Sequence, residues 1–165
     1  MNSNSSGMYI GVCVENNDPL KLGRIKVRVP IIYGNIPIED LPWAEPCFPY
    51  ATEDQSIFFI PEKESFVTVW FLNGSKYKPI WVGGIHRSDS NAVPSICKQN
   101  YPKKKVIKTK TGYMYFDDKD YEIKIEHKNG SEIILKDNGD IVIHARNHVS
   151  IYSDDDDVTT YPKDE

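Results

Sequence analysis

The sequence has no long run of apolar residues. None approaches the ~20 residues that a membrane-spanning helix needs, and the opening segment MNSNSSG is polar, without the apolar stretch of a signal peptide. We therefore predict no spanning helix and no secretory leader, and a flexible tail over residues 1–7. The net charge of −4 is too small, and of the wrong sign, to attract nucleic acid or anionic lipid over the whole surface.

Cysteine is scarce. Cys13, Cys47 and Cys97 form no Cys-x-x-Cys pair, and an odd number at wide spacing is not a disulfide framework. This usage fits synthesis in a reducing cytoplasm and predicts thiols without chemistry, either buried or at the surface.

Helical periodicity is also almost missing. No long window keeps apolar residues at i, i+3, i+4 and i+7, and eleven prolines and ten glycines divide the chain into short pieces. The fold class we predict is all-β. In the first half the expected strands cover residues 8–15, 23–29, 56–60, 65–72 and 78–85, with Asn73-Gly74 as a hairpin turn signal between the last two.

Residues 30–55 contain five prolines and are predicted to be a long connection outside the central sheet. Five or six short strands with one such connection indicate a small closed barrel of the OB-fold type over residues 8–87. We expect Trp43 to plug one end of its core. The predicted barrel core is Val27, Trp43, Val67, Val69 and Val82.

The strand expected at residues 23–29, GRIKVRV, carries a basic outer face formed by Arg24, Lys26 and Arg28. On an OB barrel, such a face with nearby aromatic residues also fits a groove for single-stranded nucleic acid. The acidic chain as a whole argues against this, so we expect the basic face to serve protein contacts or intramolecular pairing.

A predicted linker over residues 88–105 leads to a meander over residues 106–153, and an acidic tail follows at 154–165. The meander's strands are expected at 110–117, 121–128, 132–137, 140–146 and 149–153, with two-residue turns at Asn129-Gly130 and Asn138-Gly139. Such turns place Ile125 opposite Ile134, and Ile134 opposite Ile143. Ile133 and Leu135 then lie on the other face, so that both faces carry large aliphatic side chains.

Some 48 residues are marginal for a core that must bury two faces. The meander either packs on the barrel of its own chain or completes its core with further copies. We predict the second arrangement, a homotrimer. The predicted interface is Ile125, Ile133, Ile134, Leu135, Ile141, Ile143, Val149 and Ile151.

Signatures of catalysis are not found. The sequence has no Gly-x-Ser-x-Gly, His-Glu-x-x-His, Walker loop or dinucleotide fingerprint. His144 and His148 are four apart on a predicted strand and turn, about 13 Å from each other, which is too far for one metal ion. Asp154–Asp157 lacks the spacing of a calcium loop. We expect no enzyme activity, no metal site and no cofactor.

Several motifs of the first half occur in the same order as in a known protein family. YIGVCVENNDPLKLGRIKVRVP resembles the opening of the OB-fold domain in central spike proteins of contractile phage tails and in the related VgrG-like spikes of type VI secretion. LPWAEP and IPEKESFVTVWFLNGSKYKPIWVGGI are similar to later segments of that domain. One departure is the family's Pro-x-x-Gly turn, where this chain has Pro61 and Glu64. The resemblance covers residues 8–87.

The second half resembles the trimeric β-prism that follows this barrel. Thr109, Gly112 and Asp118 match the prism's opening pattern, and His127, Gly130 and Ser131 match a later one. The 88–105 linker is too short for the lysozyme domain that some members carry, so no muramidase is implied.

The resemblance implies a non-enzymatic central spike in a tail baseplate of the virion. Such a protein passes sheath contraction on to pierce the host envelope. Its implied partners are two further copies, a hub protein above and possibly a separate tip protein below, with no nucleic acid. Two alternatives stay open: a VgrG-like spike of type VI secretion, and an OB-fold protein that binds single-stranded nucleic acid.

Overall fold

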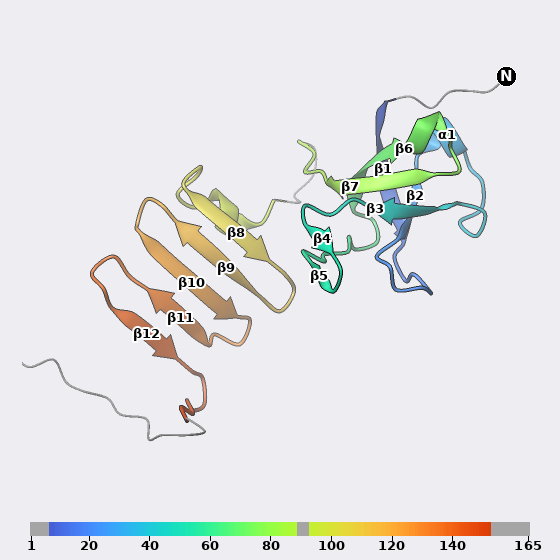
Figure 1. The fold of residues 1–165 in the computed structure, drawn as a ribbon. Helices are drawn as coiled ribbons and strands as arrows, with labels where there is room; N and C mark the ends of the chain where they lie inside the picture. Colours follow the sequence, from blue (N-terminus) through green and yellow to red (C-terminus); the bar gives the residue numbers. More distant parts are fainter. Residues whose placement is uncertain (1–6, 89–92, 153–165) are drawn as a thin grey trace, which may run out of the picture. The chain divides into compact units, whose positions relative to one another are not determined.

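A computed structural model describes residues 7–88 and 93–152 (Figure 1). The chain divides into two compact units, Met1–Ser90 and Asn91–Glu165. Each unit is built from short strands, and the chain is all-β, as its Pro- and Gly-punctuated sequence predicts. The predicted tails at 1–7 and 154–165 fall outside the described residues, apart from Gly7.

The first unit is a closed five-stranded barrel, in the order β1-β2-β3-β7-β6. Its predicted OB-type architecture is confirmed. A one-turn helix, α1 (Pro30–Tyr33), follows β2, and a 3₁₀ turn at Leu72–Gly74 follows β6. The barrel strands are β1 (Met8–Glu15), β2 (Ile25–Arg28), β3 (Trp43–Pro46), β6 (Phe66–Phe71) and β7 (Pro79–Gly84).

Two local predictions for the barrel were wrong. Strand β3 lies inside the proline-rich connection and joins the barrel, antiparallel to β2 and parallel to β7. It is tolerated there because it is four residues long and its proline, Pro46, is its last residue. The expected strand at 56–60 is reduced to a two-residue piece, β5 (Gln55–Ser56), paired with β4 (Ala51–Thr52). The β6–β7 connection spans residues 72–78, one residue longer at each end than the expected 73–77, and Asn73 and Gly74 have positive φ as the turn signal predicts.

Alternate residues of the strands point into the barrel. Val27, Val67 and Val69 lie in the buried core. Trp43 and Val82 do not, which corrects the predicted core. Val82 occupies an outward position of β7, and the inward position beside it holds Trp81, which is 3% exposed. The indole N–H of Trp81 donates to the Gly23 carbonyl oxygen at 3.1 Å, so its one polar atom is satisfied.

The second unit is a five-stranded antiparallel sheet in the order β12-β11-β10-β9-β8. A 3₁₀ turn at Ser95–Lys98 precedes it. Its first strand begins within the predicted linker, and residues 149–152, expected to be a fifth strand, are in no strand. The strands are β8 (Lys104–Lys108), β9 (Gly112–Asp117), β10 (Glu122–His127), β11 (Glu132–Leu135) and β12 (Ile141–His144).

The turns at Asn129-Gly130 and Asn138-Gly139 have three-residue loops, which corrects the predicted register. Gly130 donates its N–H to His127 and has φ +90°, and Gly139 donates to Lys136 with φ +87°. This is a type I turn closed by a residue in the left-handed region. The extra loop residue moves every pair by one position, so Ile125 lies opposite Ile133, and Ile133 opposite Ile143.

Candidate functional site

One face of the sheet is apolar across all five strands. Two rows of directly paired residues build it: Ile107–Met114–Ile125–Ile133–Ile143, and Phe116–Ile123–Leu135–Ile141 beside it. We call these nine residues the apolar face. Lys105 stands at its corner on β8, paired with Asp118.

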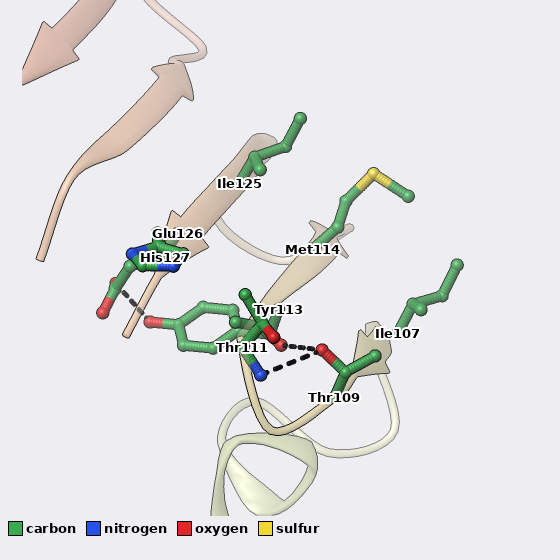
Figure 2. Close-up of a pocket in the computed structure, with 9 residues that line it drawn as sticks. Ile107, Thr109, Thr111, Tyr113, Met114, Ile125, Glu126 and His127 are labelled. Carbon is green, nitrogen blue, oxygen red and sulfur yellow. Dashed lines mark hydrogen bonds between the residues drawn. The ribbon is translucent and has the colours of Figure 1, made fainter. Parts of the chain in front are cut away.

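The apolar face is open in the single chain. Ile125 is 50% exposed, Ile143 52% and Ile141 69%. At one end of the face Ile107, Met114 and Ile125 line a shallow hollow of about 290 Å³. Figure 2 shows these three side chains pointing to one side of the sheet and Tyr113 and Glu126 to the other. An exposed apolar surface of this kind is typical of a contact site.

The predicted interface residues fall into three groups. Five of them lie on the apolar face: Ile125, Ile133, Leu135, Ile141 and Ile143. Ile134 points to the opposite face, because the three-residue turn reverses its side. Val149 and Ile151 are exposed but in no strand. Sequence reasoning missed Ile107, Met114, Phe116 and Ile123, although the last three stand at alternate positions of their strands, the pattern of a one-sided sheet.

The opposite face of the sheet, called the polar face below, carries charged groups that pair with one another, beside Val106, Ile134 and Val142. Lys124 bonds Glu126 at 2.8 Å and Glu132 at 2.6 Å, and the hydroxyl of Tyr113 donates to Glu126. Burial works against the charge of Lys124, but the two carboxylates outweigh it and raise its pKa. The Lys124 ammonium in turn holds the pKa of Glu126 below its usual range. These pairs leave the polar face suited to water and the apolar face suited to a partner.

A buried ion pair fixes the β8 end of the sheet. Lys104 and Asp117 lie 3.0 Å apart, with side chains 7% and 2% exposed. The Asn100 amide donates to Asp117 at 2.7 Å. Desolvation acts to raise the pKa of Asp117, yet bonds from Asn100 and Lys104 lower it below the ordinary range. The segment before β8 is thereby tied to the sheet.

On the barrel, the cations of the basic face are used within the chain. Arg24 bonds the carboxylate of Asp18 at 2.6 Å, and Lys26 donates to the carbonyl oxygens of Ile38 and Glu39. Trp43 lies beneath both, with its ring 5.5 Å from Arg24 and 5.3 Å from Lys26. The tryptophan expected as a core plug therefore covers the outer side of β2.

Arg28, the third cation, donates to the Gly34 carbonyl oxygen at 3.3 Å. These contacts are of the intramolecular kind expected for this strand. Arg24 and Lys26 are thereby engaged within the chain, whereas Arg28 uses one of its five N–H donors.

The described part of the chain has no cluster of metal-ligand residues and no membrane-spanning helix. No group of three or more His, Cys, Asp or Glu residues within 7–88 and 93–152 could hold a metal ion. No helix among these residues is long and apolar enough to cross a membrane. His144 and His148, weighed as metal ligands, belong to no such group.

The comparison with protein families concerns the barrel. Residues 9–86 match the family model described as the type VI secretion system/phage-baseplate injector OB domain. The barrel is similar to this injector OB domain. The match supports a structural role of the baseplate-spike type for the protein. No match was found among the curated proteins compared with the chain.

The departure noted in the sequence lies in a turn with left-handed backbone. Glu64 stands where the family's turn has glycine, and its φ is +68°, in the left-handed region. Its N–H donates to the Cys13 carbonyl oxygen at 2.9 Å, which holds the turn against β1. Glu64 thus adopts a backbone conformation that glycine takes more readily.

Proposed function

We propose that the protein is the central spike component of a contractile phage tail baseplate. It acts as a homotrimer in which the three apolar faces meet around the axis. The barrel's match to the injector OB domain supports the baseplate role. The observation that carries the trimer is the one-sided sheet, whose apolar face is exposed and whose other face is already satisfied.

Three such sheets can bury their apolar faces against one another, which one sheet cannot do alone. A five-stranded sheet on its own buries neither face, and no element of its own unit covers the apolar face among the described residues. Each half-exposed Ile or Leu that becomes buried contributes roughly 1 kcal/mol. Three copies of the apolar face supply many such side chains, which is ample to offset the entropy of association. The polar faces then lie outside.

The proposed mechanism is mechanical. Sheath contraction pushes on a hub protein, the hub on the three barrels, and the barrels on the prism, which is driven into the host envelope. Antiparallel ladders suit this load because a strand leaves only when many hydrogen bonds break together. The proposal places the protein in the virion and includes no catalysis and no cofactor. A separate tip protein below the prism is part of the same proposal.

The alternatives are a VgrG-like spike of type VI secretion and a single-strand nucleic-acid-binding protein. The first shares the domain and the assembly. The second needs free cations on the β2 face, and the contacts of Arg24 and Lys26 within the chain speak against it. Titration of a labelled oligonucleotide at ~0.15 M salt is expected to give no saturable binding. Micromolar binding lost in Arg28→Ala favours this alternative.

Light scattering tests the trimer directly. The full chain of 18.9 kDa should give three times this mass, and the barrel alone, residues 7–88, the monomer mass. A monomeric full chain at micromolar concentration rejects the trimer. A peptidoglycan turnover assay should match buffer, and turnover that a point substitution abolishes rejects the non-enzymatic role.

A further inference from the structure

Strand β7 of the barrel is paired differently on its two sides. Towards β6 the pairing continues past the end of β7, where the Ile85 N–H donates to the Phe66 carbonyl oxygen at 3.0 Å. Towards β3 the pairing ends at Trp81, whose carbonyl oxygen accepts the Cys47 N–H at 2.8 Å. Beyond that bond, no strand of the described part of the chain pairs with residues 82–84 on this side. The last three residues of β7 therefore form an open strand edge.

A hollow of about 360 Å³ lies beside this open edge and is lined in part by it. None of the residues that line it is charged, and the rings of Phe48 and Trp81 meet edge to face in its lining, with centroids 5.4 Å apart. Ile57 and Phe59 line it as well and are 47% and 56% exposed. A Cβ at Gly83 would meet no heavy atom within 4 Å, so the strand side of the hollow is open. Glycine within a strand is typical of a place where another backbone approaches closely.

An open strand edge beside an apolar hollow has the chemistry that an extended peptide recognises. The peptide backbone bonds to the edge, and its alternate side chains fill the hollow. Because the lining is uncharged, a charged side chain that entered would lose its hydration without gaining a partner, so the peptide must be uncharged there. The parts of this chain outside the described residues do not fit: 1–6, 89–92 and 153–165 read MNSNSS, DSNA and SDDDDVTTYPKDE, without alternating apolar residues. The occupant therefore comes from another molecule.

We propose that the β7 edge at residues 82–84 binds an extended, uncharged peptide segment of another protein. The segment adds to the barrel as a short strand and places an apolar side chain in the hollow, against Phe48 and the exposed Ile57 and Phe59. Main-chain hydrogen bonds to β7 supply the alignment, and the hollow selects for apolar side chains. The site lies wholly within the barrel unit, so it goes beyond the proposed spike and does not depend on the trimer.

Disulfide trapping at Cys47 tests the assignment in the full chain. Cys47 is exposed and lines the hollow, and Cys97→Ser leaves it as the accessible thiol because Cys13 is buried. Three probe peptides each carry a terminal cysteine activated as a mixed disulfide. The first is Val-Thr-Val-Thr-Val, the second is the same peptide with its backbone nitrogens methylated, and the third is Lys-Thr-Glu-Thr-Lys. Intact-protein mass spectrometry measures the reductant concentration that releases half of each peptide.

The first peptide should withstand about tenfold more reductant than the other two, because it alone has both apolar side chains and free backbone donors. Gly83→Val, which places a side chain in the open space, should remove this advantage. The matched control Thr52→Val, at an exposed position of β4 outside the hollow, should keep it.

Equal retention of the methylated peptide means that apolar side chains bind without strand addition, and this overturns the inference. Equal retention of all three peptides, or an unchanged advantage in Gly83→Val, overturns it as well. If Cys47 reacts neither with the peptides nor with a small activated disulfide, another copy covers the hollow and the inference also fails. Light scattering of the same samples keeps the two ideas apart: a trimeric mass with any of these results leaves the proposed spike standing.

Discussion

Ile133 on β11 lies directly opposite Ile143 on β12, and on its other side opposite Ile125 on β10. The three isoleucines thus form one continuous row on the same face of the sheet. Ile143 is 52% exposed at the end of this row. Neighbouring aliphatic side chains on an open sheet face form a contact surface that a single chain leaves in water.

The first prediction tests whether this row is an interface. Ile143→Asp places three carboxylates in one apolar layer of the proposed trimer, at a cost of several kcal/mol for each buried charge. We expect monomers or aggregates by light scattering. The matched control is His144→Asp, the adjacent residue, which is exposed and points to the polar face.

His144→Asp should remain trimeric with a nearly unchanged melting temperature. If Ile143→Asp also keeps its mass and its melting temperature, Ile143 is exposed in the assembly and the apolar face is not the interface.

The sequence is informative about the strands of this sheet but not about its register. Alternation of Ile123 with Ile125, and of Ile141 with Ile143, predicts strands at the observed places. Asn-Gly favours a two-residue turn, yet the three-residue loop ending in Gly130 has the same sequence signal. Because side chains alternate with period two, this one-residue difference moved Ile133 and Leu135 to the face that holds Ile125.

Prediction of the barrel from the sequence has a similar limit. Strict alternation in GRIKVRV predicts β2 and its buried valine correctly. Strand β3 was missed because a four-residue strand between prolines has no periodic signal of its own. Its tryptophan was placed in the core on size alone. Trp43 is instead the platform for Arg24 and Lys26, and only the tertiary pairing of β3 with β2 reveals this.

The second prediction concerns the turn at Glu64. A non-glycine residue at positive φ costs roughly 1 kcal/mol relative to glycine, and Glu64 has φ +68°. Glu64→Gly should therefore raise the free energy of unfolding by up to ~1 kcal/mol, part of which the more flexible unfolded chain offsets. Denaturant titration of residues 7–88 measures it. Glu53→Gly, at an exposed turn residue without positive φ, should give no gain. Equal effects of the two substitutions would show that backbone strain is not the cause.

The third prediction is a pH dependence at Asp18. The Arg24 guanidinium and the backbone N–H groups of Leu20, Leu22 and Arg24 lower the pKa of Asp18 well below its ordinary 3.8. A carboxyl whose pKa is lower in the folded state stabilises the fold above the unfolded pKa, and this stability is lost as pH falls further. Thermal melts of the wild type should fall steeply below pH 4, and those of Asp18→Asn less steeply. Parallel curves would show that Asp18 does not account for the acid sensitivity.

The last prediction compares two neighbouring ion pairs. Asp117 bonds Lys104 where both side chains are almost fully buried, whereas Asp118 bonds Lys105 with both about half exposed. Asp117→Ala leaves the Lys104 ammonium buried without its carboxylate, and the loss of one partner of a buried pair costs about 3 kcal/mol. Asp118→Ala removes a pair screened by water, which contributes only ~0–1 kcal/mol. Chemical denaturation of the full chain should separate the two variants clearly. Similar losses for both would mean that the segment around Asn100 does not shield Lys104 from solvent.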